Sequence, residues 1–377
     1  MEIYPDINAI MPFTFTVALG LFALIQLIWV IFFYSRVSFH KETTDTISTP
    51  PVSVIIAARN EEDNLFELLP FILEQQYPEF EVIVINHQSI DDSTHILKAI
   101  QRQYEHLKVI DLPSNQHLSN GKKLPLTIAI KGAKYEHLLF TDADCKPNSE
   151  YWIRGMAKHF SDKKKIVLGY GPYKSEKSFL NKIIRLDTVF IAINYFAYAK
   201  AGVPYMGVGR NLAYTKSLFL ENKGFKSHYS LQSGDDDLFI QETAKNKNYT
   251  VCLDKNSFCY SEPKKTWSEW IKQKSRHFTT TSRYGVIKKL LLGIYPLSLI
   301  LLYTSFITLL VNNWLSWISV GVIALVFILK WITHGIALKK LNERTFIWLF
   351  PLWDLFYAFL GPIIYYTTEN STEAKWK

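Results

Sequence analysis

The chain has 377 residues, of which 48% are hydrophobic and 20% are charged, and its formal net charge is +8. These averages exclude a disordered or collagen-like chain. Its three cysteines, Cys145, Cys252 and Cys259, are too few for a disulfide framework, and none lies in a CxxC pair. We expect them to be buried apolar side chains of a protein in a reducing compartment.

The first predicted element is an apolar stretch at residues 11–34, which contains no charged residue. It exceeds the roughly 20 residues that a helix needs to cross a bilayer. Residues 1–10 contain no basic residue, and no small-residue cleavage site follows the stretch. We therefore expect a retained transmembrane anchor over 1–36 rather than a signal peptide.

From residue 51 the pattern changes to short β-branched runs that alternate with amphipathic stretches. The predicted strands span 52–58, 81–86, 107–112 and 137–143, and the predicted helices span 61–76, 91–105 and 122–134. This alternation predicts an α/β domain with an open, mostly parallel sheet, whose ligands bind at the carboxyl ends of the strands. The residues that follow the strands are Arg59, Asn60, Glu61, His87, Gln88, Ser89, Asp142 and Asp144.

An acidic motif, TDAD, ends the fourth predicted strand with Asp142 and Asp144. Two carboxylates at a strand end can both approach a divalent cation, and Mg²⁺ or Mn²⁺ can hold a diphosphate there. A D-x-D triplet alone is a weak signal, and a solvated loop is the alternative. Its position directly after an apolar strand favours a metal site.

Residues 178–201 mix large apolar side chains with scattered polar ones. This pattern fits a core helix and a helix in the membrane interface equally well. If the helix is interfacial, it would border the active site and suit a lipid-linked acceptor.

A second acidic motif, SGDDDLFI at 233–240, contains the adjacent Asp235, Asp236 and Asp237. Adjacent carboxylates repel one another, so a cation or solvent must balance them, and one can have a raised pKa suited to accepting a proton. Apolar residues from Leu238 onward predict a helix, whose N-terminus tolerates negative charge. A plain acidic helix cap is the alternative.

Residues 266–278 predict an amphipathic helix. Trp267 and Trp270 would lie at the depth of the membrane interface. The polar residues that share one face by their spacing are Gln273, Arg276 and His277. An interfacial helix with incidental polar residues is the alternative.

Three further apolar stretches follow. They span 290–311, 314–338 and 346–366. Lys330 and Asp354 are their only charged residues, and these two would lie at the same depth and pair if the last two stretches are antiparallel neighbours. Alternatively, Lys330 extends to the interface and Asp354 faces the soluble domain. We predict about three transmembrane helices over 287–368, followed by a tail at 369–377.

Basic residues flank these stretches on one side. They are Arg36, Lys41, Lys288, Lys289, Lys339, Lys340 and Arg344. By the positive-inside rule, residues 37–286 are cytoplasmic and the N-terminus is outside. The positive charge fits side chains facing anionic headgroups, and no nucleic-acid motif is present. We expect an integral protein of the plasma (inner) membrane without a nucleic-acid partner.

In this order, the motifs resemble those of membrane-bound family 2 glycosyltransferases with a GT-A fold, a group that includes ceramide glucosyltransferases, poly-N-acetylglucosamine synthases and cellulose synthases. The matching pieces are PVSVIIAARNEEDNL (51–65), INHQSIDDS (85–93), GKKLPL (121–126), TDADC (141–145), GVGRNLAY (207–214), SGDDDLF (233–239) and QKSRH (273–277). The resemblance rests on their order and spacing. It implies a Rossmann-like GT-A domain over 50–286.

The resemblance also implies roles for individual residues. Asp142 and Asp144 would bind the cation and the nucleotide-sugar, with Asp144 as the more direct metal ligand. The residues implied to face the nucleotide-sugar are Arg59, Glu61, His87 and Lys122. Those implied to contact the diphosphate and the acceptor are Gln273, Arg276 and His277.

One aspartate of the second acidic motif would deprotonate the acceptor hydroxyl for in-line attack, which gives inversion. If the family motif is aligned so that the following helix matches without a gap, Asp237 takes the place of the base. Asp236 then stands where the family usually has a Glu. A different alignment of the motif selects Asp235 as the base. The motif alone leaves these alternatives open.

Three positions depart from the family pattern. His87 replaces an acidic residue that reads the uracil edge, so specificity for UDP is in question. Arg59 replaces an aromatic residue, although its guanidinium can still stack on a base. His277 replaces a Trp that lines the acceptor site, so the acceptor can differ from a growing glucan.

The sequence therefore predicts an inverting glycosyltransferase that uses Mg²⁺ or Mn²⁺. It would move a hexosyl or N-acetylhexosaminyl group from a nucleotide-sugar, with UDP expected, to a membrane lipid or lipid-linked glycan. A processive polysaccharide synthase is the first alternative. A non-enzymatic transporter or nucleotide-sugar-binding membrane protein is the second.

Overall fold

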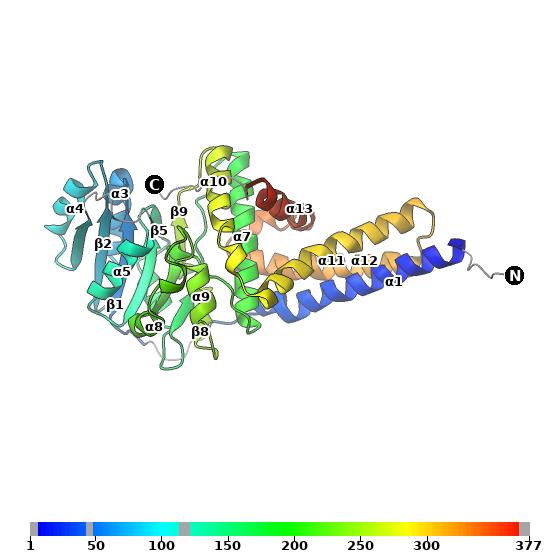
Figure 1. Cartoon of the computed structure of the whole chain (residues 1–377), viewed down its shortest axis with the longest axis horizontal. Coiled ribbons are helices and arrows are strands. Elements are labelled where there is room, and N and C mark those ends of the chain that lie inside the picture. Colours follow the sequence, from blue (N-terminus) through cyan, green and yellow to red (C-terminus); the bar gives the residue numbers. More distant parts are fainter. Residues whose placement is uncertain (1–6, 43–47, 113–120, 369–377) are drawn as a thin grey trace. The chain divides into compact units, whose positions relative to one another are not determined.

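The computed structural model describes residues 7–42, 48–112 and 121–368. The predicted tail at 369–377 and the first six residues of the predicted anchor lie outside the described residues. The chain forms two compact units (Figure 1). The helical unit contains the residues up to His40 together with Gly285–Tyr366, and Lys41–Tyr284 form nearly all of the sheet unit.

The sheet unit contains a seven-stranded sheet with the strand order β3-β2-β1-β4-β7-β6-β8. Its strands are β1 (Val52–Ala58), β2 (Phe80–His87), β3 (Leu107–Leu112), β4 (His137–Asp142), β6 (Ile166–Leu168), β7 (Leu212–Thr215) and β8 (Tyr249–Val251). The first four are parallel to one another, and β7 is antiparallel to β4. The predicted α/β class and the parallel order are confirmed.

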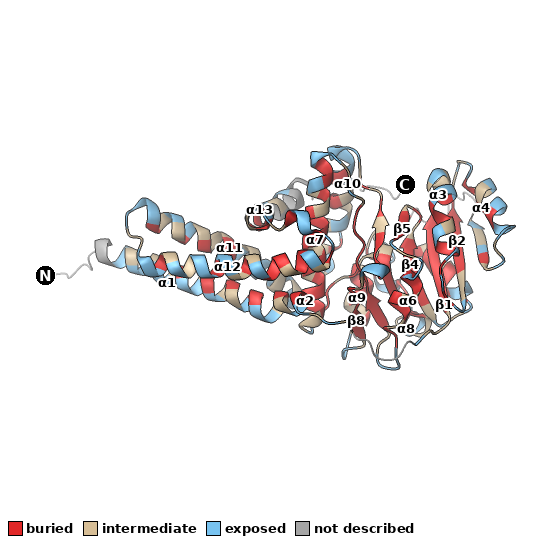
Figure 2. Cartoon of the chain, turned by 180° about the vertical axis from the view of Figure 1, so that it is seen from behind, coloured by how far each residue is buried: buried red, intermediate tan, exposed pale blue. Residues whose placement is uncertain are grey.

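The central strands form because their sequences are continuous apolar runs. All seven residues of β1 are buried, as are the last six of β2. A strand buried on both faces needs such a run, because helices cover both sides of a parallel sheet. Figure 2 shows these strands as buried, with the exposed residues on the outer faces of the helices.

The helices of the sheet unit are α3 (Glu62–Leu73), α4 (Ser93–Gln101), α5 (Lys123–Gly132), α6 (Trp152–Ala157), α7 (Phe179–Lys200), α8 (Lys216–Glu221), α9 (Asp237–Thr243) and α10 (Trp267–Phe278). The first three correspond to the predicted helices and are shorter. A small second sheet pairs β5 (Cys145–Pro147) with β9 (Cys259–Ser261). The three cysteines are free and buried, as predicted.

Helix α7 is a core helix, which decides between the two interpretations of its sequence. Most of its side chains are buried, and its exposed residues, Phe179 and Lys182, lie in its first turn. Asp187 of α7 accepts hydrogen bonds from Lys274 of α10 through both carboxylate oxygens, at 2.9 Å. Trp270 of α10 is also buried, whereas Trp267 at the start of this helix is exposed, and the predicted position of α10 at the membrane interface stays a prediction. Helix α10 packs against the interior of the sheet unit through Trp270.

The helical unit consists of α1 (Ile7–Trp29), a π-helical segment η1 (Val30–Tyr34), α2 (Ser35–Ser38), α11 (Val286–Val311), α12 (Trp317–Lys340), a short turn η6 (Arg344–Phe346) and α13 (Phe350–Thr368). Among the described residues, three helices are long and apolar enough to cross a membrane. They are Ile10–Ser38, Val286–Val311 and Trp317–Lys340. The described apolar part of α13, Phe350–Leu360, is shorter. A fourth crossing stays a prediction.

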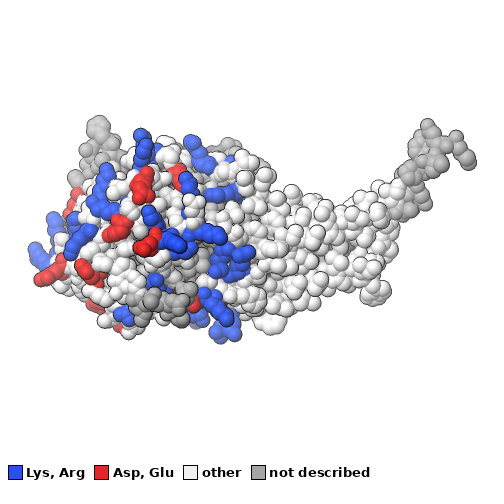
Figure 3. All heavy atoms as spheres, turned by 90° about the horizontal axis from the view of Figure 1, so that it is seen from below, with Lys and Arg blue, Asp and Glu red and all other residues white. Residues whose placement is uncertain are grey.

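The long helices of this unit present apolar side chains on their outer surfaces. Leu21 and Leu24 of α1, Leu297 of α11 and Ile328 of α12 are each more than half exposed. On the face shown in Figure 3, Lys, Arg, Asp and Glu gather over the sheet unit and are nearly absent from these helices. Exposing such an apolar surface to water costs free energy, whereas contact with lipid tails does not.

A buried polar network joins four helices of this unit. Lys330 of α12 and Asp354 of α13 form the predicted ion pair, and both are buried. Gln26 of α1 accepts a hydrogen bond from Lys330 at 2.8 Å and donates one to Ser298 of α11 at 2.8 Å. Tyr295 of α11 donates to Asp354 at 2.7 Å. Each polar group thus has a partner in an otherwise apolar bundle.

This network predicts how charge variants behave. Lys330→Met leaves a buried carboxylate without its cation, which typically costs about 3–5 kcal/mol. The exchange Lys330→Asp with Asp354→Lys should therefore fold better than either single reversal. Thermal unfolding of the purified protein in detergent measures the difference. Equal stability of all four variants would show that the pair contributes nothing.

Candidate active site

The loops that follow β1 and β2 hold one another at the carboxyl edge of the sheet. Asn60 adopts a left-handed backbone conformation, with φ 52°, which Asn tolerates better than most residues. Its N–H donates to Ser89 Oγ at 2.9 Å, and its Oδ1 accepts from the N–H of Ile90 at 2.9 Å. The motif residues Arg59 and Glu61 are thereby placed on either side of a fixed turn.

The D-x-D motif lies at the same edge, where β4 ends. Lys122, the residue before α5, forms an ion pair with Asp142. Burial raises the pKa of Asp142, but the charge and the hydrogen bond of Lys122 outweigh it, so the pKa lies below its usual value. The pKa of Lys122 is raised despite its burial, because Asp142 and Asp235 favour its charged form. Lys122 therefore acts on both acidic motifs.

Asp144 differs from Asp142 in its environment. Burial, the nearby charge of Asp142 and that of Glu61 raise the pKa of Asp144. Asp142, Asp144 and Cys145 offer ligand atoms that all lie within 4.8 Å of one another. A divalent cation would relieve this repulsion between carboxylates, and their oxygens suit Mg²⁺ or Mn²⁺ better than the thiol does. The residues present thus fit a divalent cation held mainly by Asp144.

A cation that the sequence did not single out lies beside this motif. Arg210, in the turn η2 (Gly209–Asn211), donates to the carbonyl of Gly171 at 2.7 Å and to the hydroxyl of Tyr173 at 2.9 Å. Its charge helps to lower the pKa of Asp142. The GVGRN motif contains Arg210, but nothing in its pattern distinguishes a site residue from a turn.

Tyr173 links Arg210 to α10 through its hydroxyl. Its hydroxyl also accepts a hydrogen bond from Gln273 at 3.0 Å. Arg276, one turn along α10, contributes to the lowered pKa of Asp142 as well. Gln273 and Arg276 therefore belong to the same site as the D-x-D motif. The side chain of His277 keeps an accessible surface, yet desolvation by the surrounding protein and the charges of Arg276, Lys274 and Arg210 lower its pKa, so His277 lies near the same cations.

The three adjacent aspartates have distinct partners. Asp237 is buried, and its Oδ2 accepts hydrogen bonds from the hydroxyls of Thr280 and Tyr284. Asp236 accepts from the N–H of Gly209 at 3.0 Å and from that of Asp237 at 2.8 Å. For Asp235 there is no hydrogen bond to another residue among those described. Its carboxylate is the one of the three that keeps its lone pairs available.

The aspartates face the turn that carries Arg210. A Cβ atom at Gly209 would lie 3.6 Å from Asp236 Oδ2 and 3.7 Å from Asp235 Oδ2. Burial, followed by the charges of Asp235 and Asp237, raises the pKa of Asp236 to about 7. This cluster can hold a proton near neutral pH, which is the property that a general base requires.

A buried lysine holds the loop that leads to the aspartates. Lys123 is 2% exposed. Its Nζ donates to the backbone carbonyls of His228, Leu231 and Ser233 at 2.6, 2.8 and 2.7 Å. Burial lowers the pKa of Lys123 to about 8, although Asp235 and Asp237 oppose the shift. All three donors of the ammonium group are used, so Lys123 fixes the path of residues 228–233.

Two residues predicted to face the nucleotide have different positions. His87 is the last residue of β2 and is fully buried. Ile90, three residues later, is 90% exposed. Arg59 is partly exposed, and its Nε has no hydrogen-bond partner among the described residues. Arg59 thus has a donor available to a ligand, and the contact of either residue with the nucleotide stays a prediction.

Two family models match the chain. The model described as glycosyl transferase family 2 matches residues 53–211, and the one described as glycosyl transferase family group 2 matches residues 138–361. The first covers the parallel strands and the D-x-D motif. The second covers more than half of the chain and continues through the aspartates and α10 into the helical unit.

Several proteins resemble parts of the chain. A poly-beta-1,6-N-acetyl-D-glucosamine synthase of Staphylococcus epidermidis is 30% identical over 36% of this chain and 32% of its own length. The UDP-Glc:alpha-D-GlcNAc-diphosphoundecaprenol beta-1,3-glucosyltransferase WfaP of Escherichia coli is 29% identical over 34% of this chain and 48% of its own. The matches thus span about a third to a half of these relatives.

A solved structure has a similar fold. The mannosyltransferase PcManGT from Pyrobaculum calidifontis, in complex with GDP-Man and Mn²⁺, aligns with a TM-score of 0.56. The alignment covers 90% of this chain and 99% of that one, at 17% sequence identity. At this identity the similarity establishes the fold, which is the GT-A type.

Proposed function

The chain belongs to the family 2 glycosyltransferases, and from this premise we propose that it is an inverting enzyme. It would move one sugar from a nucleotide-sugar to a hydroxyl group of a membrane lipid or polyprenyl-linked acceptor. The observation that carries this proposal is the meeting of two acidic motifs with Lys122, Arg210 and Arg276. The cations suit a diphosphate leaving group, and the carboxylates suit the proton of the acceptor hydroxyl.

The D-x-D motif is proposed to hold a divalent cation with the diphosphate. Asp142 is already engaged by Lys122, so Asp144 is the better candidate for the direct ligand. A bound cation would stabilise the charge that develops on the diphosphate as the anomeric C–O bond breaks. Arg210 and Arg276 would stabilise the same negative charge on the diphosphate. The relative of known structure with this fold is in complex with Mn²⁺, which supports the same class of ion here.

The second acidic motif is proposed to supply the general base. The sequence match without a gap favours Asp237, but this carboxylate already accepts from Thr280 and Tyr284 in a buried position. Asp235 retains free lone pairs and lies beside Lys122 and Gly209. We therefore favour Asp235 as the residue that takes the acceptor proton, with Asp236 and Asp237 shaping its environment. Attack from the face opposite the leaving group would invert the anomeric carbon.

A lipid acceptor is supported by the apolar helices and by one relative. Three helices are long and apolar enough to cross a membrane, and WfaP is named for an acceptor linked to diphosphoundecaprenol. In this membrane setting the sheet unit would lie on the cytoplasmic side of the plasma membrane. The S. epidermidis relative is a polymer synthase, which keeps processive synthesis as the alternative.

Transfer assays test the proposal. The full-length protein in detergent is incubated with radiolabelled UDP-glucose, UDP-N-acetylglucosamine or GDP-mannose, Mn²⁺ or Mg²⁺, and either membrane lipids or undecaprenyl-diphosphate-linked N-acetylglucosamine. A lipid product that carries one added sugar is expected. A product found only as long polymer would favour the synthase. Nucleotide-sugar binding without transfer to any acceptor would favour a non-enzymatic protein.

The pH profile gives a second test. Burial and the charges of Asp235 and Asp237 raise the pKa of Asp236 to about 7, so Asp236 should keep a proton below that pH. Loss of this proton adds a negative charge beside the proposed base Asp235 and makes it more basic, so kcat/KM should rise with pH through about 7. Asp237→Asn removes one of the two charges that raise this pKa, so the midpoint should move to lower pH. Glu67→Gln on the exposed face of α3 is the control. A midpoint that is the same in all three proteins would contradict this assignment.

A further inference from the structure

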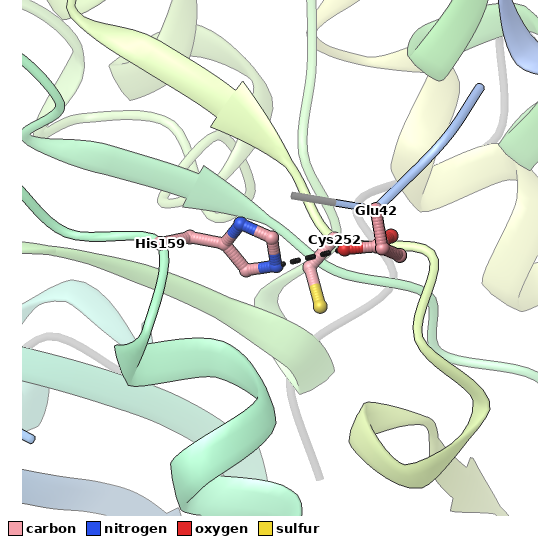
Figure 4. A group of neighbouring side chains, drawn as sticks. All are labelled: Glu42, His159 and Cys252. Atoms are coloured by element: carbon pink, nitrogen blue, oxygen red, sulfur yellow. Dashed lines mark ion pairs between the residues drawn. The ribbon is translucent and has the colours of Figure 1, made fainter. Parts of the chain in front are cut away.

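Three side chains with metal-binding groups meet inside the sheet unit, outside the proposed active site. Glu42 lies near the start of the unit, His159 follows α6, and Cys252 follows β8 directly (Figure 4). Their ligand atoms all lie within 4.8 Å of one another. His159 Nε2 and Glu42 Oε2 are 3.1 Å apart. Residues from three distant parts of the chain thus bring a nitrogen, a sulfur and an oxygen within 4.8 Å of one another.

The positions of these atoms are set from outside the cluster. The N–H of Leu253 donates to Glu42 Oε1 at 2.6 Å, which turns the other oxygen, Oε2, toward His159. Cys252 is fully buried and His159 is 9% exposed. Hydrogen bonds of this kind orient the ligands of metal sites from the second layer of residues.

An ion pair between Glu42 and His159 accounts for only part of this arrangement. Their two charges attract each other at 3.1 Å, but the buried His159 Nε2 has no well-aligned hydrogen-bond acceptor among the described residues. Cys252 Sγ lies 2.9 Å from Ser257 Oγ and 3.4 Å from the carbonyl oxygen of Gly155, and it joins Glu42 in favouring the charged form of His159. Loss of the protons of Cys252 and His159 would leave three ligand atoms close together around a shared centre.

We propose that Glu42, His159 and Cys252 bind one Zn²⁺ ion, with water as the fourth ligand. Zinc takes Cys sulfur at about 2.3 Å and His nitrogen or carboxylate oxygen at about 2.0–2.2 Å. In a tetrahedral site these bond lengths place the ligand atoms about 3.3–3.8 Å apart. The nitrogen and oxygen lie 3.1 Å apart and all three ligand atoms lie within 4.8 Å of one another, so small shifts of the side chains would seat the ion.

The charges of the site balance. On binding, Cys252 releases its thiol proton and His159 is bound as the neutral imidazole. The thiolate and the Glu42 carboxylate then carry two negative charges, which the ion neutralises. A neutral cluster suits a buried position better than an isolated pair of ions does. The ion would fix the first residues of the sheet unit to α6 and β8.

Cobalt substitution tests the site without relying on activity. The full-length protein is stripped with a chelator and titrated with Co²⁺, whose bond to a thiolate absorbs strongly in the near ultraviolet. We expect this band at one equivalent of Co²⁺ in the wild type, and we expect it to disappear in Cys252→Ser. The band should decrease at least tenfold in His159→Ala. Elemental analysis of untreated protein should show about one zinc per chain, which Cys252→Ser loses.

Two matched controls separate this site from the D-x-D motif. Cys259→Ser changes a second buried thiol and should keep the band. Cys145→Ser changes the thiol beside Asp144 and should also keep it. A band that persists in Cys252→Ser, or is lost in Cys145→Ser, would overturn the proposal. The absence of any thiolate band in folded wild-type protein would do the same, and neither outcome affects the proposed transferase activity.

Discussion

Asp235→Asn is expected to lower kcat by about 10²- to 10⁴-fold, the usual contribution of a general base. The amide keeps the size of the side chain but cannot accept the acceptor proton. Because Asp235 makes no hydrogen bond to another described residue, the substitution should leave the fold and the Kd for the nucleotide-sugar nearly unchanged. Steady-state kinetics with a lipid acceptor, together with equilibrium binding of the donor, measures both quantities.

Asp237→Asn is the matched comparison. This variant places an amide against the hydroxyls of Thr280 and Tyr284, so its main effect should be a loss of stability of about 1–3 kcal/mol. The opposite result, a stable Asp237→Asn protein without turnover and an active Asp235→Asn protein, would return the role of base to Asp237.

Lys123→Met is expected to lower kcat by about tenfold to a hundredfold, which corresponds to the loss of one hydrogen bond to a charged group. The methionine fills the space of the lysine stem but leaves the carbonyls of His228, Leu231 and Ser233 without their donor. The loop before Asp235 would then take other paths. Hydrogen exchange of residues 228–233 measures this change beside the kinetics.

A second lysine provides the control for Lys123. Lys216 also donates to two backbone carbonyls, those of Lys131 and Ala133, but it lies at the far end of α5. Lys216→Met should therefore leave kcat within about twofold of the wild type, since surface changes away from a site have small effects. Equal losses in both variants would mean that Lys123 serves only general stability.

Lys123 also predicts an alkaline limit. Its pKa is lowered to about 8, so it loses its proton at a lower pH than an ordinary lysine. The neutral amine has two N–H groups for three carbonyls, and its lone pair faces an acceptor. Turnover should therefore decline as the pH rises above about 8. A profile that is flat to pH 9.5 would contradict this mechanism.

The parts of the fold that could be predicted are those whose sequences are long and uniform. The runs at 52–58 and 107–112 became β1 and β3 without a change of boundary. The strands β6, β7 and β8 have only three or four residues, which is too short for a recognisable alternation. They form because they pair with neighbours that lie far away in the sequence.

The same limit applies to the site. Lys122 and Asp142 could be assigned to the site because they lie in motifs at a helix start and a strand end, but the sequence did not predict the ion pair between them. Arg210 and Lys123 could not be assigned because their roles depend on Tyr173 and on the carbonyls of a distant loop. The position of His87 at a strand end favoured a ligand contact, and the sequence did not predict that its side chain is fully buried.

The hydrogen bonds of Gln26 have a consequence for the order in which the chain assembles. Gln26 lies on the first helix, but its partners Ser298 and Lys330 lie 272 and 304 residues later. During synthesis this amide can meet them only after the sheet unit, α11 and most of α12 have been made. The first helix is therefore a late-binding component of the bundle, and a generic apolar anchor in its place would leave Lys330 and Ser298 without the amide that joins them.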